Sequence, residues 1–201
     1  MSGYRRKDAF HQRAKREGYR SRAAYKLAEI DDRHSLLAPG ARVVDLGAWP
    51  GGWLQVAAER VGASGRVVGV DLVAIDPLGI ENVFAIQGDF GEPGVLQAIL
   101  DTLGGPADVL LCDAAPKLTG LRDVDRAREA SLLEAVVAAL PTLLRPGGDL
   151  LCKLLDSPEA DAIGRRLGQS FREARTLRPE ATRKGSAERY LLARTFQTKG
   201  R

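Results

Sequence analysis

The segment from Val43 to Trp53 constrains the fold of this chain more than any other part of it. A short β-branched run ends on Asp45 and is followed by a turn that contains three glycines and a proline. A helical apolar pattern then runs from about Leu54 to Val61. A strand, a glycine-rich turn and a helix in this order are typical of an open α/β sheet, which binds a nucleotide-type ligand at the carboxyl end of its first strand.

The turn also indicates which kind of ligand it suits. It reads D-x-G-x-x-P-G-G, whereas a pyrophosphate-binding turn reads G-x-G-x-x-G. Glycines permit positive φ and a close approach of backbone to ligand, but Pro50 removes one N–H that a diphosphate could use. We therefore expect a nucleoside-type ligand without phosphates, with S-adenosylmethionine as the candidate. A purely structural turn is the alternative.

Length and composition indicate one domain with an aliphatic core. The chain has 201 residues, 44% hydrophobic and only 5% aromatic, as a buried Val/Leu/Ile/Ala sheet would require. No apolar run reaches the roughly 18 residues of a membrane span, and the N-terminus lacks the apolar segment of a signal peptide. We expect a cytoplasmic monomer without membrane contact. Cys112 and Cys152 lie in apolar runs, so we expect reduced packing residues and neither a disulfide nor a metal site.

Positive charge is concentrated at the two ends of the chain. Residues 1–22 contain eight Lys/Arg and two acids, residues 165–201 contain eleven and three, and residues 23–164 contain eleven and twenty-one. Net charges of +6 and +8 therefore flank −10, which favours a polyanion bound by the termini. Residues 1–20 have scattered aromatics and no sustained apolar period, so we expect a flexible basic arm that binds RNA. Basic tails without a partner are the alternative.

The remaining sequence alternates between strand and helix patterns after a first helix at about Ser21–Asp32, for which Ser21 is the expected cap. Alternation predicts a parallel sheet with helices on both faces, and two final strands without a long helix between them predict an antiparallel hairpin at one edge. The expected fold is α/β, a Rossmann-like, mostly parallel seven-stranded sheet of the methyltransferase type, forming a single domain over residues 21–201. The further strands are expected at Arg66–Val70, Val83–Gln87, Asp108–Cys112, Asp149–Leu154, Arg172–Leu177 and Arg189–Thr195, and the further helices at Gly94–Leu103, Val124–Leu144 and Ser157–Gln169.

Carboxylates follow four successive strand ends, namely Asp45, Asp71, Asp89 and Asp113. Ligands of such sheets bind outside these ends. We therefore expect Asp71 to accept hydrogen bonds from the two hydroxyls of a ribose and Asp89 to accept a hydrogen bond from an adenine amino group. Asp45 is expected to cap the amides of the turn. A carboxylate-rich crevice suits a cationic sulfonium, as would the face of Trp49 or Trp53. Each acid taken singly could instead cap the next helix.

Two lysines stand in apolar surroundings. Lys153 lies within the apolar strand 150–155, where a buried lysine must be paired or functional. Lys26 interrupts an apolar helix with Arg22 four residues before it, and the alternative for Lys26 is an ordinary exposed helix lysine.

Taken together, several motifs resemble the FtsJ/RrmJ (RlmE) family of RNA ribose 2′-O-methyltransferases, from about Ala14 to Phe196. The family's Lys-Asp-Lys-Glu tetrad falls in order on Lys26, Asp113, Lys153 and Glu188, which the resemblance implies are catalytic. Trp49 and the run 117–120 depart from the family pattern. The motifs are Ser21–Leu27, Asp45–Trp53, Gln87–Phe90, Asp113–Pro116, Cys152–Lys153 and Ser186–Tyr190.

The resemblance implies S-adenosyl-L-methionine as cofactor, no metal, and methylation of a uridine ribose in large-subunit (23S) ribosomal RNA, the A-loop uridine on the assembled 50S particle. A tRNA or mRNA-cap ribose, or a non-catalytic ribosome assembly role, are the alternatives. Expected cofactor positions are Gly47, Gly51, Trp53, Asp71, Asp89 and Asp113, and expected RNA contacts are Arg5, Arg6, Arg13, Arg16, Arg20, Arg22, Arg183 and Lys184.

A hypothesis for the chemistry follows from the tetrad. A ribose hydroxyl must lose its proton as it attacks the methyl carbon, and Lys153 is the candidate base. Desolvation and a neighbouring cation favour the neutral amine that a base requires. Lys26 would supply that cation and stabilise the developing alkoxide, while Asp113 and Glu188 would orient the two lysines.

Overall fold

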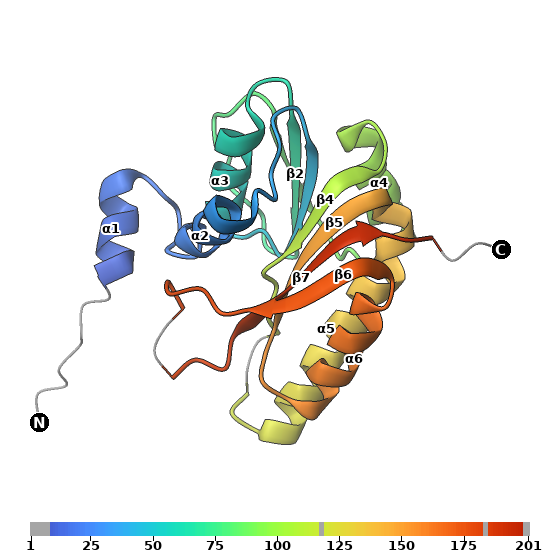
Figure 1. Ribbon diagram of the computed structural model, residues 1–201. Helices are drawn as coiled ribbons and strands as arrows, with labels where there is room; N and C mark the ends of the chain where they lie inside the picture. Colours follow the sequence, from blue (N-terminus) through green and yellow to red (C-terminus); the bar gives the residue numbers. More distant parts are fainter. Residues whose placement is uncertain (1–8, 117–118, 183–184, 199–201) are drawn as a thin grey trace, which may run out of the picture.

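The computed structural model of the protein describes residues 9–116, 119–182 and 185–198 (Figure 1). A seven-stranded sheet lies at its centre. The strands are β1 (Arg42–Leu46), β2 (Arg66–Asp71), β3 (Val83–Gln87), β4 (Ala107–Cys112), β5 (Leu144–Leu154), β6 (Phe171–Leu177) and β7 (Arg189–Phe196). The helices are α1 (Ala9–Glu17), α2 (Ala24–His34), α3 (Gly52–Val61), α4 (Pro93–Leu103), α5 (Arg122–Leu143) and α6 (Pro158–Gly168).

The strand order is β3-β2-β1-β4-β5-β7-β6. β1 pairs in parallel with β2 and with β4, whereas β7 runs antiparallel to both of its neighbours. The predicted mostly parallel, Rossmann-like sheet is confirmed, including the antiparallel hairpin at one edge. The order reverses between β1 and β4, and this reversal opens a crevice beyond the carboxyl ends of the strands, where sheets of this type bind ligands.

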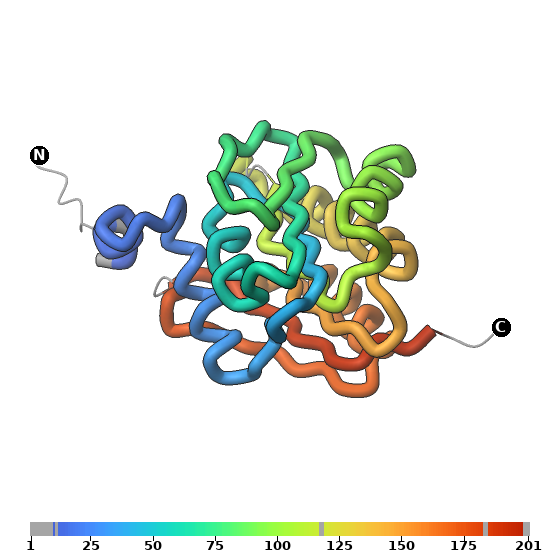
Figure 2. The backbone as a smooth tube through the Cα atoms, turned by 90° about the horizontal axis from the view of Figure 1, so that it is seen from above, coloured from blue at the N-terminus to red at the C-terminus, as the bar shows by residue number. Residues whose placement is uncertain are grey.

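Helices cover both faces of the sheet (Figure 2). Successive residues of β1 point to opposite faces, so Val43 belongs to the core cluster that includes residues of α2 and α3, whereas Val44 belongs to the cluster that includes residues of α4, α5 and α6. Burial on both faces explains why the central strands read as continuous apolar runs. Within the described residues, no helix is both long enough and apolar enough to span a membrane.

The first predicted helix begins later than the sequence indicated. Its N-cap is Ala23 and no side chain caps it, so the capping role predicted for Ser21 is wrong. The Ser21 hydroxyl instead lies against the glycine-rich turn, where a Cβ added to Gly52 would stand 2.3 Å from the Ser21 Oγ. Tertiary contact with the turn thus determines where this segment lies.

The N-terminal arm differs from its prediction. Residues 9–17 form helix α1, which lies beside α2 at one end of the molecule in Figure 1. Ala14 is buried against Tyr25, and the ring of Phe10 lies 5.7 Å from that of Tyr25. A flexible arm over residues 1–20 is therefore wrong for its described part, because Phe10 and Ala14 dock the helix against Tyr25 without a long apolar period.

Candidate active site

The glycine-rich turn between β1 and α3 is shaped by close approaches within the protein. Gly47 has φ of 78°, and a Cβ there would meet the Cα of Ala114 at 2.5 Å. Gly51 has φ of 108° and is the N-cap of α3. Both conformations are ones that side-chain-bearing residues rarely adopt. Gly47 brings the turn up to the loop after β4, and Gly51 allows the turn to lead into α3.

A cavity of about 580 Å³ opens beside this turn, at the carboxyl ends of β1, β2 and β4. This volume lies within the range of small-molecule sites, about 300–1,000 Å³. Its lining combines three of the four predicted strand-end carboxylates with apolar side chains and one arginine. The lining residues include Gly47, Trp49, Asp71, Leu72, Asp89, Phe90, Asp113, Ala114, Arg128, Leu132 and Ala135.

Backbone amides hold two of these carboxylates in place. The Asp71 carboxylate accepts from the N–H of Trp49 at 3.0 Å and from the N–H of Val73 at 2.9 Å. Oδ1 of Asp89 accepts from the N–H of Gly91 at 2.8 Å. Each carboxylate oxygen retains further acceptor capacity, so both groups are oriented and still able to accept from a ligand.

The four tetrad residues meet at one place, although they lie far apart in the sequence. Lys26 Nζ lies 3.0 Å from Glu188 Oε2, and Lys153 Nζ lies 3.1 Å from Asp113 Oδ1. Lys153 also donates to the backbone carbonyl of Asp113. The lysines are 4% and 8% exposed respectively, so Lys26 is not the ordinary exposed helix lysine that the sequence left open.

Tyr190 joins the two ion pairs, and the sequence argument assigned it no role. Its hydroxyl donates to Asp113 Oδ1 at 2.8 Å and accepts from Lys26 Nζ at 3.2 Å. The side chain is fully buried, and its ring lies 5.8 Å from that of Trp53. The alternation of β7 could have pointed to Tyr190, since it stands two residues after Glu188 and therefore on the same face.

Burial and neighbouring charges set the protonation states in this cluster. Burial alone would raise the pKa of Glu188, but Lys26, Lys153 and the Ser186 hydroxyl together outweigh burial and hold this pKa below its usual range. Burial, and then the charge of Asp113, raises the pKa of Tyr190 well above normal. The cluster therefore contains an ionised Glu188 and a neutral phenol that can donate to Asp113.

Asp45 does not cap the turn, so that prediction is wrong. The N–H groups of Gly47 and Ala48 donate to the carbonyl of Val70 at 2.8 and 3.1 Å, and neither carboxylate oxygen of Asp45 has a hydrogen-bond partner among the described residues. Asp45 is completely buried. Burial, and then the nearby charge of Asp113, raises the pKa of Asp45 well above its usual value.

Trp53 is placed differently from Trp49. The indole of Trp53 is 3% exposed and its Nε1 donates to the carbonyl of Ala23 at 2.8 Å, so this side chain supports α2 and does not line the cavity. Trp49 is 56% exposed and does line the cavity. Of the two rings proposed to face a sulfonium, only Trp49 is placed at the cavity.

The predicted RNA contacts fall into three groups. The exposed side chain of Arg13 pairs with Glu17 on α1, where Arg16 is also exposed, and Arg22 is half-buried just before α2. Arg20 donates to backbone carbonyls of the protein itself, so the structure does not support an RNA contact for it. The predicted contacts that lie outside the described residues are Arg5, Arg6, Arg183 and Lys184.

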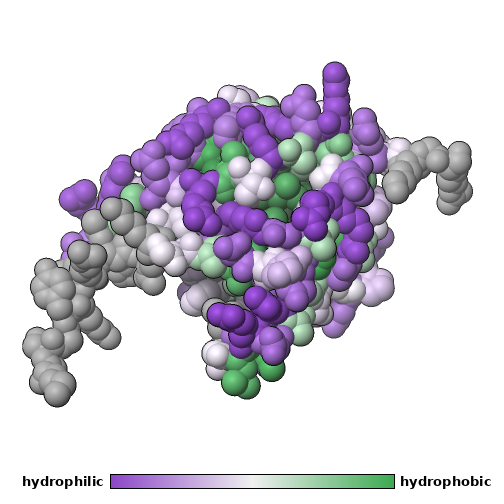
Figure 3. All heavy atoms as spheres, turned by 60° about the horizontal axis from the view of Figure 1, so that its bottom comes forward, coloured by the Kyte–Doolittle hydropathy of each residue, from purple (hydrophilic) through white to green (hydrophobic). Residues whose placement is uncertain are grey.

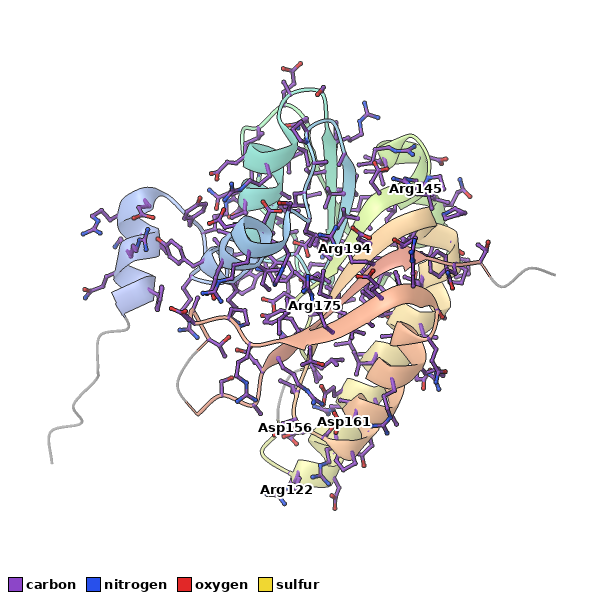
Figure 4. All side chains as sticks on the ribbon, in the orientation of Figure 1. Arg122, Arg145, Asp156, Asp161, Arg175 and Arg194 are labelled. Atoms are coloured by element: carbon purple, nitrogen blue, oxygen red, sulfur yellow. The ribbon has the colours of Figure 1, made fainter. Side chains whose placement is uncertain are left out.

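Two arginines in the second half of the chain also form ion pairs within the fold. Arg194 pairs with Asp149, and Arg145 pairs with Asp108. Figure 4 shows Arg145 and Arg194 toward the end of the sheet at which the parallel strands begin. Figure 3 looks toward the opposite end, where the surface is largely hydrophilic and interrupted by groups of hydrophobic atoms.

Comparison with known proteins agrees with this arrangement. The sequence model of the FtsJ-like methyltransferase family matches residues 19–196. Ribosomal RNA large subunit methyltransferase E of Methanothermobacter thermautotrophicus is 44% identical over 97% of this chain and 92% of that protein. The protein of the same name from Acidithiobacillus ferrooxidans is 44% identical over 95% of this chain and 86% of that protein.

Solved structures show the same fold. The crystal structure of a ribosomal RNA methyltransferase from Plasmodium falciparum superimposes with a TM-score of 0.77 at 28% identity, covering 90% of this chain and 100% of that one. Fibrillarin of Aeropyrum pernix, solved with S-adenosyl-L-methionine, is similar in fold alone, with a TM-score of 0.57 at 16% identity over 79% of this chain and 68% of that one. The chain therefore belongs to the FtsJ-like methyltransferase family.

Proposed function

We propose that this protein transfers a methyl group from S-adenosyl-L-methionine to the 2′-hydroxyl of a uridine ribose in large-subunit ribosomal RNA, namely the A-loop uridine of 23S RNA on the assembled 50S particle. The observation that carries the proposal is the buried cluster of Lys26, Asp113, Lys153 and Glu188 beside a nucleoside-sized cavity. The names of the relatives, which are ribosomal RNA large subunit methyltransferases, support the choice of RNA.

The cavity suits this cofactor chemically. Asp71, Asp89 and Asp113 line it, and three carboxylates favour a ligand with a ribose diol, an amino group and a cationic centre over one with phosphates. Asp71 would bind the ribose hydroxyls, Asp89 would bind the adenine amino group, and Asp113 would contact the methionyl end. When bound, the cofactor supplies a methyl group activated by a positively charged sulfur.

Trp53 would contribute through its backbone N–H. It stands in the first turn of α3, where the first N–H groups have no intrahelical acceptor and the helix dipole favours a negative group. The carboxylate of the methionyl moiety is such a group. This assignment replaces the indole contact suggested by the sequence, because the ring of Trp53 is turned toward α2. Gly51 would contribute only by shaping the turn, because its N–H already donates to the carbonyl of Ala48 at 2.7 Å.

Lys153 would accept the proton of the ribose hydroxyl. An amine can do so only in its neutral form. The Lys153 amine is buried and contacts Asp113, and the Lys26 amine lies across Tyr190 from it. Lys26 stays paired with Glu188 at 3.0 Å and would stabilise the oxyanion as it forms. Asp113 would orient the Lys153 amine, which its carboxylate and carbonyl both contact.

Incubation of the protein with radiolabelled cofactor and large subunits that lack the modification tests the proposal. We expect label on one ribose, which mapping of the RNA would locate. The Lys153→Ala variant should bind cofactor and transfer no methyl group. Methyl transfer to tRNA or to capped mRNA would show that one of these RNAs, and not ribosomal RNA, is the substrate. Methyl transfer by the Lys153→Ala variant would show that Lys153 is not the base. No label on any RNA would favour an assembly factor.

A further inference from the structure

The segment that precedes α2, residues 18–21, is hydrogen-bonded to α3. The backbone N–H of Arg20 donates to Oε1 of Gln55 at 2.8 Å, and Nε2 of Gln55 donates to the carbonyl of Gly18 at 2.9 Å. The hydroxyl of Tyr19 donates to Glu59, also on α3, at 2.9 Å. Three hydrogen bonds thus fix a segment whose sequence reads as part of a basic arm.

The guanidinium of Arg20 connects two loops that are distant in the sequence. Its Nη1 donates to the carbonyl of Pro50 at 3.2 Å and to the carbonyl of Asp76 at 2.6 Å, and its Nη2 donates to the carbonyl of Pro77 at 2.7 Å. Pro50 belongs to the glycine-rich turn, whereas Asp76 and Pro77 belong to the irregular connection between β2 and β3. A planar group with five donors is suited to holding several acceptors at fixed positions.

The glycine-rich turn leaves room for this segment. A Cβ on Gly51 would lie 3.2 Å from Cδ of Arg20, and one on Gly52 would lie 2.3 Å from the hydroxyl of Ser21. These two glycines therefore admit residues 20 and 21 of the protein, in addition to any ligand. The turn and the segment fit each other closely.

The two loops joined by Arg20 form adjoining parts of the cavity wall. Gly47 and Trp49 come from the glycine-rich turn, while Asp71 and Leu72 stand where the second connection begins. We propose that Arg20 is a positioning residue for the cofactor: it holds the turn and the connection at the spacing that S-adenosyl-L-methionine requires. The inference rests on the proposed function, in which this cavity binds that cofactor.

Loss of the guanidinium would release three carbonyls to water and leave the two loops free to separate. Cofactor binding would then have to order them, so its affinity falls. Turnover at saturating cofactor remains close to normal, because Arg20 contacts none of the tetrad side chains in the described structure. We expect Arg20→Ala to raise the Kd for S-adenosyl-L-methionine about tenfold or more, the effect of losing at least one net hydrogen bond.

The experiment uses the full-length protein with Arg20→Ala, Arg20→Lys and a matched control, Arg16→Ala. Arg16 is an exposed arginine on α1, so its loss should reduce the salt dependence of RNA binding and leave cofactor affinity unchanged. Calorimetry would measure the Kd for S-adenosyl-L-methionine, methylation assays would separate KM from kcat, and titration of transcribed large-subunit RNA at several salt concentrations would give the slope.

The inference predicts a raised Kd and KM for cofactor with Arg20→Ala, a kcat within about twofold of wild type, an unchanged salt slope, and partial recovery with Arg20→Lys. Unchanged cofactor affinity, or a salt slope of RNA binding reduced as in Arg16→Ala, would overturn the inference. The reduced slope would indicate that Arg20 contacts RNA. If Arg20→Ala does not fold, the same criteria apply to Arg20→Lys. Absence of cofactor binding by the wild-type protein would instead overturn the proposed function on which the inference rests.

Discussion

Removal of one oxygen atom, by the substitution Tyr190→Phe, tests whether the two ion pairs act as one unit. The Tyr190 hydroxyl is the only group described between them that contacts both Lys26 and Asp113, at 3.2 and 2.8 Å. The ring would remain packed against Trp53. The change therefore removes two hydrogen bonds from a buried site and creates almost no cavity.

The loss of stability and of kcat can be estimated from the hydrogen bonds that the substitution removes. A hydrogen bond to a charged group contributes about 1.5–3 kcal/mol. Lys26 keeps Glu188 at 3.0 Å and Asp113 keeps Lys153 at 3.1 Å, so neither charge is left unpaired and the lower end applies to each bond. The two bonds together give about 3 kcal/mol, which corresponds to a lowering of Tm by about 6–12 °C in a domain of this size and to an upper limit of about 150-fold on the loss of kcat.

Single-turnover methylation and thermal unfolding measure the two quantities. We expect kcat to fall about 10- to 100-fold while the Kd for the cofactor changes little. Tyr25→Phe is the matched control: its hydroxyl also donates to a carboxylate, Glu17, at 2.8 Å, but it lies against α1 and outside the tetrad. Wild-type kcat in Tyr190→Phe, or equal losses in the two variants, would refute the coupling of the ion pairs.

Three further predictions concern other parts of the molecule. Because the pKa of Asp45 is raised in the folded state, wild-type stability falls as pH rises above the unfolded value of about 3.9; Asp45→Asn should flatten this decline, and parallel Tm-versus-pH curves would contradict it. Cofactor should change the fluorescence of the exposed Trp49 and not of the buried Trp53, so a full signal in Trp49→Phe would exclude Trp49 from the site. Deletion of residues 1–8, which contain three basic residues, should lower the salt slope of RNA binding by about 2; an unchanged slope would remove this segment from RNA binding.

The sequence predicted the parts of the fold that follow from local signals. The β-branched run before Asp45 and the apolar strand around Lys153 are buried on both faces, so their composition alone marks them as central strands. The tetrad was found because the family motifs place its members in order. Their contacts span as many as 162 residues of sequence separation, which the register of the sheet determines and which no local pattern contains.

Other features could not be predicted because tertiary contacts override local preference. Helix α1 forms through docking of a few side chains around Tyr25, and Ser21 gives up a capping role to pack against Gly52. Arg20 looks like one more basic residue of the arm until its acceptors, three backbone carbonyls, are known. A basic residue in a charged segment thus gives no sign in the sequence of whether it faces solvent or protein.

The position of β7 has a consequence for the synthesis of this protein. β7 inserts between β5 and β6 and brings Glu188 and Tyr190 to Lys26, although it is the last strand along the chain. Until it emerges from the translating ribosome, β5 has an unpaired edge and the lysine of α2 lacks its counterion. A nascent chain therefore completes the tetrad only as its final strand docks, and a product truncated before residue 188 would lack Glu188 and Tyr190 and expose an aggregation-prone edge.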